Sequence, residues 1–354
     1  MKVLLWGPIS PKGQPSRGGF EATNRKIADK LEEVGICVQE TPNPLKNHKL
    51  GVLGGIVYLK LFLSPLKLLK YYRKKNCVLH ITPNAGPFIY PFSIIVCFAY
   101  LLKIPVLYHM MAGTFFIFYA RNSILYRFAA NILIKKSSAI AVEGTVQIQK
   151  LRDIIGYKGK IHYLPTTTYC RDLSKHHIGK DVYNLFYFGR LNKAKGVNMM
   201  FDIIELLDDR FHLYLDGFIS DDIDKARLYS SKTTYLGIES KSQLKETMKN
   251  MTFFILPTTH EGEGQPNSLI EAMAEGLIPI TSNQGFCTDV VGDCGKVLST
   301  KSTAEEYRDA ILDLCDKDLE TLSKKCQERI VKNHNADVEI LKLIDIYESI
   351  LASR

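Results

Sequence analysis

The chain has 354 residues, of which 46% are hydrophobic and 23% charged, a composition that excludes a disordered chain and fits two ordered domains of ordinary size. Its eight cysteines are scattered, with no close pair at metal-ligand spacing. This excludes a disulfide framework or a zinc site and predicts reduced, mostly buried thiols in a cytosolic protein. The net charge of +9 is unevenly spread, because residues 41–142 hold thirteen Lys and Arg and no Asp or Glu.

Expected strands and helices alternate along the chain, which implies parallel sheets. The first half offers strands near residues 2–7, 36–39, 77–82, 105–109, 138–142 and 161–164. After a polar linker, the second half offers strands near residues 184–190, 211–215, 233–236, 252–256, 278–281 and 296–298, and helices over 302–316, 318–331 and 336–352. We therefore predict an α/β fold of two doubly wound, Rossmann-like domains, residues 1–170 and 181–335, facing across a cleft and followed by a helical segment, 336–354. Ligands are expected at the carboxyl ends of the strands.

The first strand follows Met1 and Lys2, and its apolar segment is too short for the core of a signal peptide. It ends in a long loop, residues 7–19, that closes with Gly18 and Gly19. Glycines at the start of a helix let the backbone approach a ligand closely, and an ordinary pair of loop glycines is the alternative.

The basic stretch includes a segment in which cations and leucines alternate at helical spacing. Leu59, Leu63, Leu66 and Leu69 are interleaved with the cations, and Pro65 is the expected start of a helix. We predict that this segment lies on an anionic membrane, with membrane-facing residues Lys60, Lys67, Lys70, Lys74 and Lys75. A solvated helix face is the alternative. Nucleic acid is not expected as a partner, because no nucleic-acid module is recognisable.

An uncharged apolar run, residues 87–102, lies between two expected strands. A membrane-spanning helix needs about 20 residues. We therefore predict a buried crossover helix.

A second glycine-rich loop follows the apolar strand that ends at Leu256, and a short helix containing Glu271 follows the loop. A strand, a glycine loop and a helix N-terminus form an anion site, because the free N–H groups of the first helical turn point at the ligand. Glu263 lies in the loop, eight positions before Glu271. A phosphate-binding loop flanked by two carboxylates suits a nucleotide sugar.

These residues carry a family resemblance. Residues 263–274, EGQPNSLIEAMA, resemble the E-x7-E signature of family 4 retaining glycosyltransferases, which have the GT-B fold. Tyr187 to Leu191 (YFGRL) with Lys195, Gly196 and Val197 resemble that family's G-R-L-x(3)-K-G segment, and residues 285–298 resemble its next loop and strand. The resemblance covers the second half well and the first half loosely.

The resemblance implies a role for each matching residue. Arg190 and Lys195 would neutralise the leaving diphosphate, Glu263 would orient the sugar hydroxyls of the donor, and Glu271 would accept from the ribose hydroxyls. The implied donor-binding set is Gly18, Gly19, Gly189, Arg190, Lys195, Glu263, Gly264, Gln265, Pro266, Asn267, Ser268 and Glu271. No Asp-x-Asp metal motif occurs, so we expect neither metal nor cofactor. The family's last helix also crosses back onto the first domain.

Two positions depart from the family pattern. Residues 109–115, HMMAGTF, resemble its H-x-H-G-G-S-F segment, but Met111 stands where the second His would lie beside the reacting sugar. His109 is therefore the candidate for that catalytic role. The family's Asn after the sixth strand is also missing, and residues 164–167, LPTT, stand there. Retaining enzymes of this class are thought to use no protein nucleophile, so the missing His is compatible with activity.

We therefore expect a retaining glycosyltransferase that moves a sugar from a nucleotide-diphosphate sugar to a hydroxyl of a lipid-linked or growing glycan, in the synthesis of a cell-surface polysaccharide such as O-antigen, capsule or exopolysaccharide. It would be cytoplasmic and peripherally bound to the inner face of the membrane. One alternative is a nucleotide-sugar epimerase or phosphorylase of the same architecture. The other is a degenerate, non-catalytic membrane-associated partner, which Met111 favours and the intact Arg190, Lys195, Glu263 and Glu271 oppose.

Overall fold

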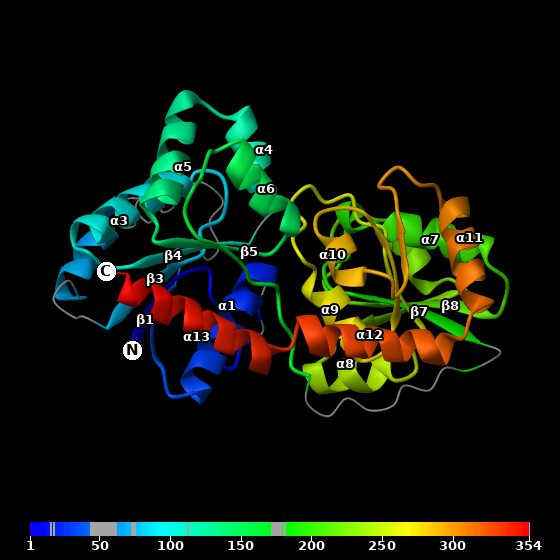
Figure 1. Ribbon diagram of the computed structural model, residues 1–354. Helices are drawn as coiled ribbons and strands as arrows, with labels where there is room; N and C mark the ends of the chain where they lie inside the picture. The colour runs from blue at the N-terminus through cyan, green and yellow to red at the C-terminus, as the bar shows by residue number, and fades with distance from the viewer. Residues whose placement is uncertain are drawn as a thin grey trace. The chain divides into compact units, whose positions relative to one another are not determined.

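The computed structural model describes residues 1–14, 16, 18–42, 62–71, 76–111, 113–170, 179 and 182–353. The chain forms two compact units. One comprises Met1–Thr167 with Ala336–Arg354, and the other comprises Thr168–Asn335. Each unit has a parallel six-stranded sheet enclosed by helices (Figure 1). All twelve strands expected from the sequence are present, and the two-sheet α/β fold is confirmed.

The sheet of the first unit has the order β2-β1-β3-β4-β5-β6. Its strands are β1 (Lys2–Gly7), β2 (Cys37–Pro42), β3 (Cys77–Ile81), β4 (Val106–Met110), β5 (Ala139–Val142) and β6 (Ile161–Tyr163). Every residue of β3, β4 and β5 is buried. Near-continuous apolar runs are typical of parallel strands that are covered on both faces.

One face of this sheet is covered by η1 (Ser64–Tyr71), α3 (Ile89–Leu101), α4 (Phe115–Arg121), α5 (Ile124–Lys136) and α6 (Thr145–Asp153). On this face η1 and α5 both pack against α3. The other face is covered by α1 (Gly19–Glu33) and α13 (Ala336–Ala352). Because Leu343, Tyr347 and Ile350 of α13 join the core formed with Val3 and Val78, the end of the chain belongs to the first unit.

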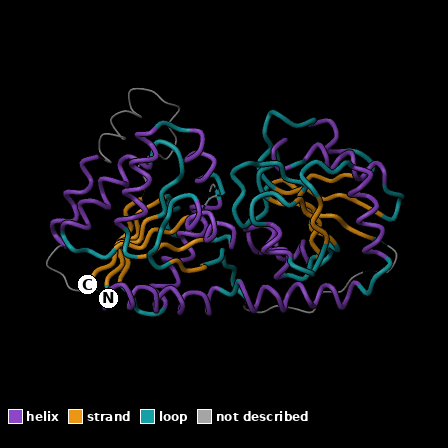
Figure 2. The backbone as a smooth tube through the Cα atoms, turned by 45° about the horizontal axis from the view of Figure 1, so that its top comes forward, coloured by secondary structure: helices purple, strands orange, loops and turns teal. Residues whose placement is uncertain are grey.

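The sheet of the second unit has the order β12-β11-β10-β7-β8-β9. Its strands are β7 (Tyr183–Phe188), β8 (Phe211–Asp216), β9 (Thr233–Gly237), β10 (Phe253–Leu256), β11 (Ile278–Ser282) and β12 (Lys296–Leu298). In Figure 2 these strands lie among the helices of their own unit. The central strands β7, β10 and β11 are almost wholly buried.

The helical elements of the second unit are η2 (Lys193–Lys195), α7 (Val197–Leu206), η3 (Lys225–Tyr229), α8 (Lys241–Met248), α9 (Asn267–Ala274), α10 (Cys287–Val291), α11 (Ala304–Cys315) and α12 (Leu319–Asn333). Capping boxes start two of them, Ser240 with Gln243 at α8 and Thr303 with Glu306 at α11. Side-chain caps satisfy backbone N–H groups that have no partner within the helix.

The apolar run at residues 87–102 forms the crossover helix α3, as predicted. Across the part of the chain that the structure describes, no helix has both the length and the apolar character needed to span a membrane. Lys60, Lys74 and Lys75 of the basic segment lie outside the described residues. Lys67 and Lys70 lie on η1 and are exposed, together with Leu63, Leu66 and Leu69.

Candidate functional site

Three loops of the second unit meet at the carboxyl edge of its sheet. They follow β7, β10 and β11, which are neighbours in the strand order. In a parallel sheet the carboxyl ends of adjacent strands lie at one edge, where ligands bind in doubly wound folds. The two motifs singled out in the sequence, around Lys195 and Glu263, therefore belong to one loop cluster.

Lys195 and Glu263 form an ion pair within this cluster. The Lys195 Nζ lies 2.7 Å from Glu263 Oε1 and 2.6 Å from Oε2. Only 6% of the Glu263 side chain is exposed, against 21% of the Lys195 side chain. A carboxylate buried to this degree requires a charged partner. Lys195 provides it, a link between the two motifs that their sequence patterns did not predict.

Thr258 supports the same carboxylate and was missed in the sequence. Its Oγ1 lies 2.9 Å from Glu263 Oε2 and 3.1 Å from the Ala194 carbonyl. Its own carbonyl accepts from Ser282 Oγ at 2.5 Å. Thr258 thus ties the loop after β10 to the loop after β7 and to the end of β11. The available signal was a polar residue two positions after a buried apolar strand and five positions before Glu263.

Two glycines let the loops touch through their backbones. Gly196 has a φ of 82°, and a Cβ there would lie 2.3 Å from the Pro257 carbonyl oxygen. Gly285 has a φ of 61°, and a Cβ there would lie 2.4 Å from the Glu263 carbonyl oxygen. Only glycine adopts such a φ at little cost and also permits such a close approach. The position of the Glu263 backbone therefore depends on Gly285.

Arg190 lies in the same electrostatic environment and has an exposed side chain. Its carbonyl accepts from Tyr187 Oη at 3.2 Å. Burial lowers the pKa of His260. The charge of Glu263 opposes this, and the charges of Lys195 and Arg190 lower the pKa further. The side chain of Arg190 is therefore exposed at the surface of the cluster. The charge of Lys195 is instead compensated by Glu263.

The loop after β10 leads directly into α9. The cap residue Pro266 makes no side-chain hydrogen bond to the first turn of α9, because proline has no polar side-chain group. Asn267 and Ser268 begin the helix, and Glu271 follows within it; all three are partly exposed. Gln265 is buried. The predicted anion site is thus a helix N-terminus beside the Lys195–Glu263 pair, and its ligand remains a prediction.

Asp216 at the end of β8 is a buried carboxylate that the sequence patterns did not indicate. Burial raises its pKa to about 6, and the hydrogen bond that it accepts from the Glu239 backbone N–H at 2.8 Å opposes the rise. The next residue, Gly217, packs so closely on Gly189 that a Cβ would lie 1.7 Å from the Gly189 carbonyl oxygen. This close packing requires glycine at position 217, whereas at position 189 glycine is favoured by the φ of 134°.

The first-unit candidates Gly18 and Gly19 lie at the start of α1. Gly18 has a φ of −170°, which any residue adopts, and a Cβ there would meet no heavy atom within 4 Å. The fold therefore imposes no local need for glycine at this position. A role in ligand approach stays a prediction.

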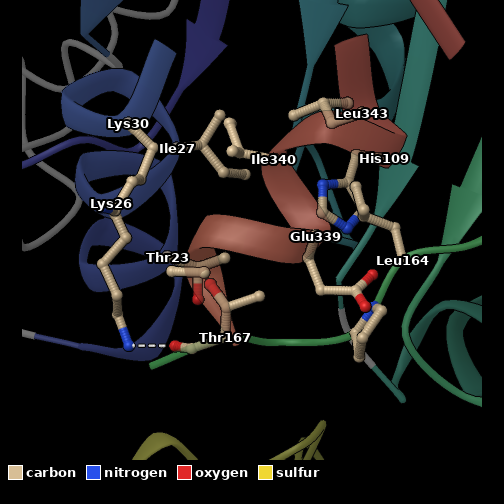
Figure 3. A pocket seen from close by; sticks show the side chains of 12 residues that line it. Thr23, Lys26, Ile27, Lys30, His109, Leu164, Thr167, Glu339, Ile340 and Leu343 are labelled. Carbon is tan, nitrogen blue, oxygen red and sulfur yellow. Dashed lines mark hydrogen bonds between the residues drawn. The ribbon is translucent and has the colours of Figure 1, made fainter. Parts of the chain in front are cut away.

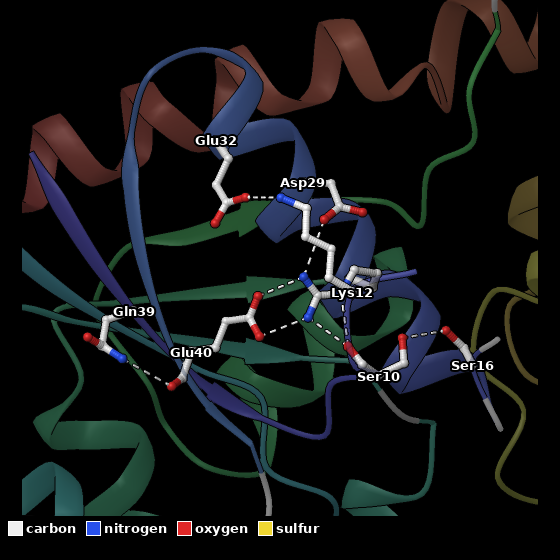
Figure 4. A network of polar contacts seen from close by, with 8 residues as sticks. Ser10, Lys12, Ser16, Asp29, Glu32, Gln39 and Glu40 are labelled. Atoms are coloured by element: carbon white, nitrogen blue, oxygen red, sulfur yellow. Dashed lines mark hydrogen bonds and ion pairs between the residues drawn. The ribbon is translucent and has the colours of Figure 1, made fainter. Parts of the chain in front are cut away.

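A polar network holds the loop that leads to Gly18 (Figure 4). Arg25 of α1 donates to Glu40 Oε1 at 2.6 Å and Oε2 at 2.8 Å. It also donates to the Ser10 carbonyl at 2.9 Å and 2.6 Å. Ser10 and Ser16 join through their hydroxyls at 2.9 Å, and Lys12 pairs with Glu32 at 2.7 Å. The loop is therefore fixed to the helix that it precedes.

His109 lies at a pocket in the interior of the first unit. It faces α1 and α13 and shares the pocket with Lys26, Lys30 and Glu339 (Figure 3). The ring is almost wholly buried, and neither ring nitrogen has a hydrogen-bond partner of good geometry among the described residues. Lys26 Nζ donates to the Thr167 carbonyl at 2.6 Å. This buried setting offers no support for a catalytic His109, and that role stays a prediction.

The fold resembles solved glycosyltransferase structures over its full length. Sucrose-phosphate synthase from Thermosynechococcus elongatus is similar with a TM-score of 0.74 and 17% identity, covering 100% of both chains. HepE from Anabaena in complex with UDP is similar with a TM-score of 0.73 and 14% identity, covering 99% of this chain and 100% of that chain. The chain has the GT-B fold.

A third similar structure is the pneumococcal O-GlcNAc transferase GtfA in complex with UDP and GlcNAc, with a TM-score of 0.64 and 15% identity, covering 82% of this chain and 60% of that chain. Residues 183–317 match the family model described as glycosyl transferases group 1. No curated protein sequence matches the chain. The family match spans the loop cluster and supports glycosyltransferase as the class of this GT-B protein.

Proposed function

We propose that this GT-B protein is a retaining glycosyltransferase that uses a nucleotide-diphosphate sugar. The observation that carries the proposal is the Lys195–Glu263 ion pair, held at the carboxyl edge of the second sheet beside the N-terminus of α9. Helix N-termini and fixed cations favour a diphosphate. The complexes of HepE with UDP and of GtfA with UDP and GlcNAc support a nucleotide sugar as the ligand.

The proposed chemistry needs charge stabilisation at the leaving group. When the bond between the anomeric carbon and the diphosphate oxygen breaks, negative charge grows on the diphosphate. The exposed Arg190 and the remaining N–H of Lys195 would stabilise that charge, as would the first turn of α9. The sugar passes to an acceptor hydroxyl on the same face, and the hydroxyl proton passes to the leaving phosphate. Because these groups supply the positive charge, the reaction would need no metal ion.

In addition to contacting the donor, Glu263 would position the ammonium group of Lys195. Both of its oxygens lie within hydrogen-bond distance of Lys195 Nζ. The carboxylate therefore fixes where the ammonium group lies, and a preorganised charge is most effective when it need not move during the reaction. Glu271 remains the proposed partner of the ribose hydroxyls.

The proposed acceptor is a lipid-linked or growing glycan of a cell-surface polysaccharide, reached at an anionic membrane surface. Its support is the absence of acidic residues between Glu40 and Glu143, together with the exposure of Lys67 and Lys70 beside Leu66 and Leu69. Cations interleaved with exposed apolar side chains are typical of surfaces that lie on anionic lipid.

Donor turnover tests the proposal. The full chain is incubated with a panel of UDP-, GDP- and dTDP-sugars, with and without EDTA, and release of the free nucleoside diphosphate is measured. We expect slow hydrolysis of one donor that persists in EDTA and falls about 100-fold in Arg190→Ala. If a donor binds but no sugar is transferred, even when lipid-linked acceptors are present, the result would favour the non-catalytic alternative that Met111 suggests. Loss of turnover in EDTA, with recovery on adding Mg²⁺, would contradict the metal-independent mechanism.

A further inference from the structure

The start of α5 exposes a cluster of large apolar side chains. Ile124 is 84% exposed, Leu125 65% and Phe128 63%. They belong to one helical turn, at the end of α5 that follows α4 (Figure 1). Single exposed apolar residues are ordinary, but three large ones on one turn mark an interaction site. We call Ile124, Leu125 and Phe128 the apolar tip.

The tip is presented by a well-organised turn. The Tyr126 N–H donates to Ser123 Oγ at 3.3 Å, which caps the start of α5. Arg127 donates to the carbonyls of Tyr119 and Ala120, at 3.0 Å and 2.9 Å, at the end of α4. Asn122 Nδ2 donates to the Phe118 carbonyl at 2.9 Å. These bonds satisfy polar backbone groups of the turn internally, as entry into an apolar phase requires.

Tyr126 anchors the tip to the core. Its ring is buried between Tyr90 and Phe118, at centroid distances of 6.0 Å and 6.4 Å. Its Oη also accepts from the Gly86 backbone N–H at 3.3 Å. The exposed residues on either side of Tyr126 are therefore held in place by one buried neighbour. Their exposure is a fixed feature of the fold.

The surroundings of the tip are cationic. Arg121 and Arg127 are both exposed beside it. No Asp or Glu occurs anywhere in α3, α4 or α5, whereas Lys135 and Lys136 lie at the other end of α5. Exposed apolar residues ringed by cations match a lipid interface, where apolar side chains enter the acyl boundary and cations meet anionic headgroups.

We propose that the apolar tip is an anchor that inserts into an anionic lipid surface. A second copy of the chain fits less well, because a two-fold contact through the tip would bring the Arg121 and Arg127 pairs of both copies together. The helix that carries the tip, α5, covers the same sheet face as η1, and α3 packs against both. Lys67 and Lys70 on η1 would attract the protein to the anionic membrane surface. The apolar tip would then insert into the lipid and keep the protein bound. This proposal extends the membrane part of the proposed function and stands without any activity measurement.

A fluorescent reporter tests insertion directly. The chain has a single Trp, Trp6, which is buried in the core. In a Phe128→Trp variant of the full chain, the added indole should shift to shorter wavelength on vesicles of phosphatidylcholine with phosphatidylglycerol. Acyl-chain-brominated lipid should quench it. Unchanged emission on these vesicles overturns the anchor. A concentration-dependent shift without lipid also overturns it, in favour of self-association.

Vesicle flotation separates the tip from the electrostatic contact. Binding is measured at low salt and at 0.5 M NaCl for the wild type, for Ile124→Ser/Leu125→Ser/Phe128→Ser, and for the control Val331→Ser/Val338→Ser/Leu341→Ser. The control residues are exposed apolar residues of α12 and α13. We expect the tip variant to lose at least about 10-fold of the salt-resistant binding, since each buried CH₂ group adds to insertion. Equal loss in the control overturns the proposal.

The two proposals can fail separately. Donor hydrolysis is assayed on the same tip variant, whose substitutions lie outside the second unit. Retained hydrolysis with lost flotation supports both proposals. Absent hydrolysis in the wild type, with flotation that depends on the tip, overturns the enzymatic proposal and leaves the anchor standing. Unchanged far-ultraviolet circular dichroism in the tip variant excludes unfolding as the cause of lost binding.

Discussion

Lys195 Nζ contacts both carboxylate oxygens of Glu263, although 68 residues separate the two in the sequence. The contact joins the loop after β7 to the loop after β10. Because the carboxylate is nearly buried and the ammonium group is partly exposed, the two residues contribute unequally when either is removed. The proposed catalytic role of this pair and its structural role therefore overlap.

Lys195→Ala should destabilise the second unit as well as reduce turnover. It leaves Glu263 as a buried carboxylate without a cation, which typically costs about 3–5 kcal/mol. Glu263→Gln should cost less, about 1 kcal/mol, because the partly exposed ammonium group can be solvated. Urea unfolding at pH 7 measures both variants.

The double variant Lys195→Ala/Glu263→Gln is the control. It removes the cation and the buried charge together, so it should be more stable than Lys195→Ala alone. A strictly additive cycle would show that the pair is not coupled in solution. Arg190→Ala, which changes an exposed side chain, should reduce turnover with little effect on unfolding.

Gly285→Ala should displace the Glu263 backbone. The new Cβ would lie 2.4 Å from the Glu263 carbonyl oxygen, in a left-handed conformation that disfavours alanine. We expect a loss of about 2 kcal/mol or more in unfolding free energy and weaker nucleotide affinity. Calorimetry with UDP and urea unfolding measure the two effects.

Gly18→Ala is the matched glycine control. Gly18 is extended and has open space around it, so the substitution should cost about 0.5 kcal/mol or less. If Gly18→Ala nevertheless weakens donor binding, close approach of a ligand to this backbone gains support. If Gly18→Ala and Gly285→Ala lower the free energy of unfolding equally, the close contact between Gly285 and Glu263 is not the cause of the destabilisation.

The positions of the strands and the parallel sheets could be predicted from the sequence, but the individual side-chain contacts could not. Runs such as Phe253 to Leu256 predict buried parallel strands because their apolar character is continuous. The loops that follow such strands then meet at one edge of a sheet. The resemblance to family 4 glycosyltransferases predicts that Lys195 and Glu263 share one donor site, and in the structure the two side chains form an ion pair.

The contact partners inside the site depend on information that no local pattern holds. Whether Lys195 bonds Glu263, and whether Thr258 shares that carboxylate, depends on how three separate loops stack. Asp216 was also missed, because a single Asp after an apolar strand is typical of many folds. His109 matched a motif, yet strand alternation turns its side chain toward α13, into the interior of the first unit.

Acid should destabilise the first unit through His109. Burial lowers its pKa to about 4, and the Leu164 backbone opposes the shift only in part. Below about pH 6.5 the unfolded chain takes up a proton that the folded chain excludes, so stability is lost as the pH falls from 6.5 toward 4. The loss attributable to His109 should be on the order of 3 kcal/mol. Urea unfolding from pH 7.5 to 4 measures it.

His109→Gln isolates this contribution, because glutamine does not titrate. The difference in unfolding free energy between wild type and variant should shrink or reverse as the pH falls. His80 also has a lowered pKa, caused by burial and by His109, and remains in the variant. Some acid sensitivity should therefore persist. Parallel pH profiles for the two proteins would show that His109 is not held neutral by the fold.

Lys67→Gln/Lys70→Gln should weaken binding to anionic vesicles at low salt. Each Lys near such a surface contributes about 1 kcal/mol, so two substitutions should reduce the partition coefficient about 30-fold. The effect should nearly vanish at 0.5 M NaCl, because salt screens exposed charges. Flotation with neutral vesicles is the control. Equal binding to neutral and anionic vesicles would contradict an electrostatic contribution to membrane binding.

Asp216→Asn should stabilise the protein at neutral pH, opposite in sign to the acid effect of His109. Burial raises the folded-state pKa of Asp216 to about 6, above its ordinary value. The folded chain therefore holds a proton that the unfolded chain releases, and stability is lost as the pH rises from about 4 to 6. Asparagine can still accept from the Glu239 N–H and carries no charge to bury. Urea unfolding should show a gain of about 1–3 kcal/mol in the free energy of unfolding at pH 7 and none at pH 4.

Asp208→Asn is the matched control. Arg210 lowers the pKa of Asp208, so the same change there should destabilise the protein at pH 7. A gain in both variants would mean that the loss of any negative charge, rather than release of a buried carboxylate, causes the effect.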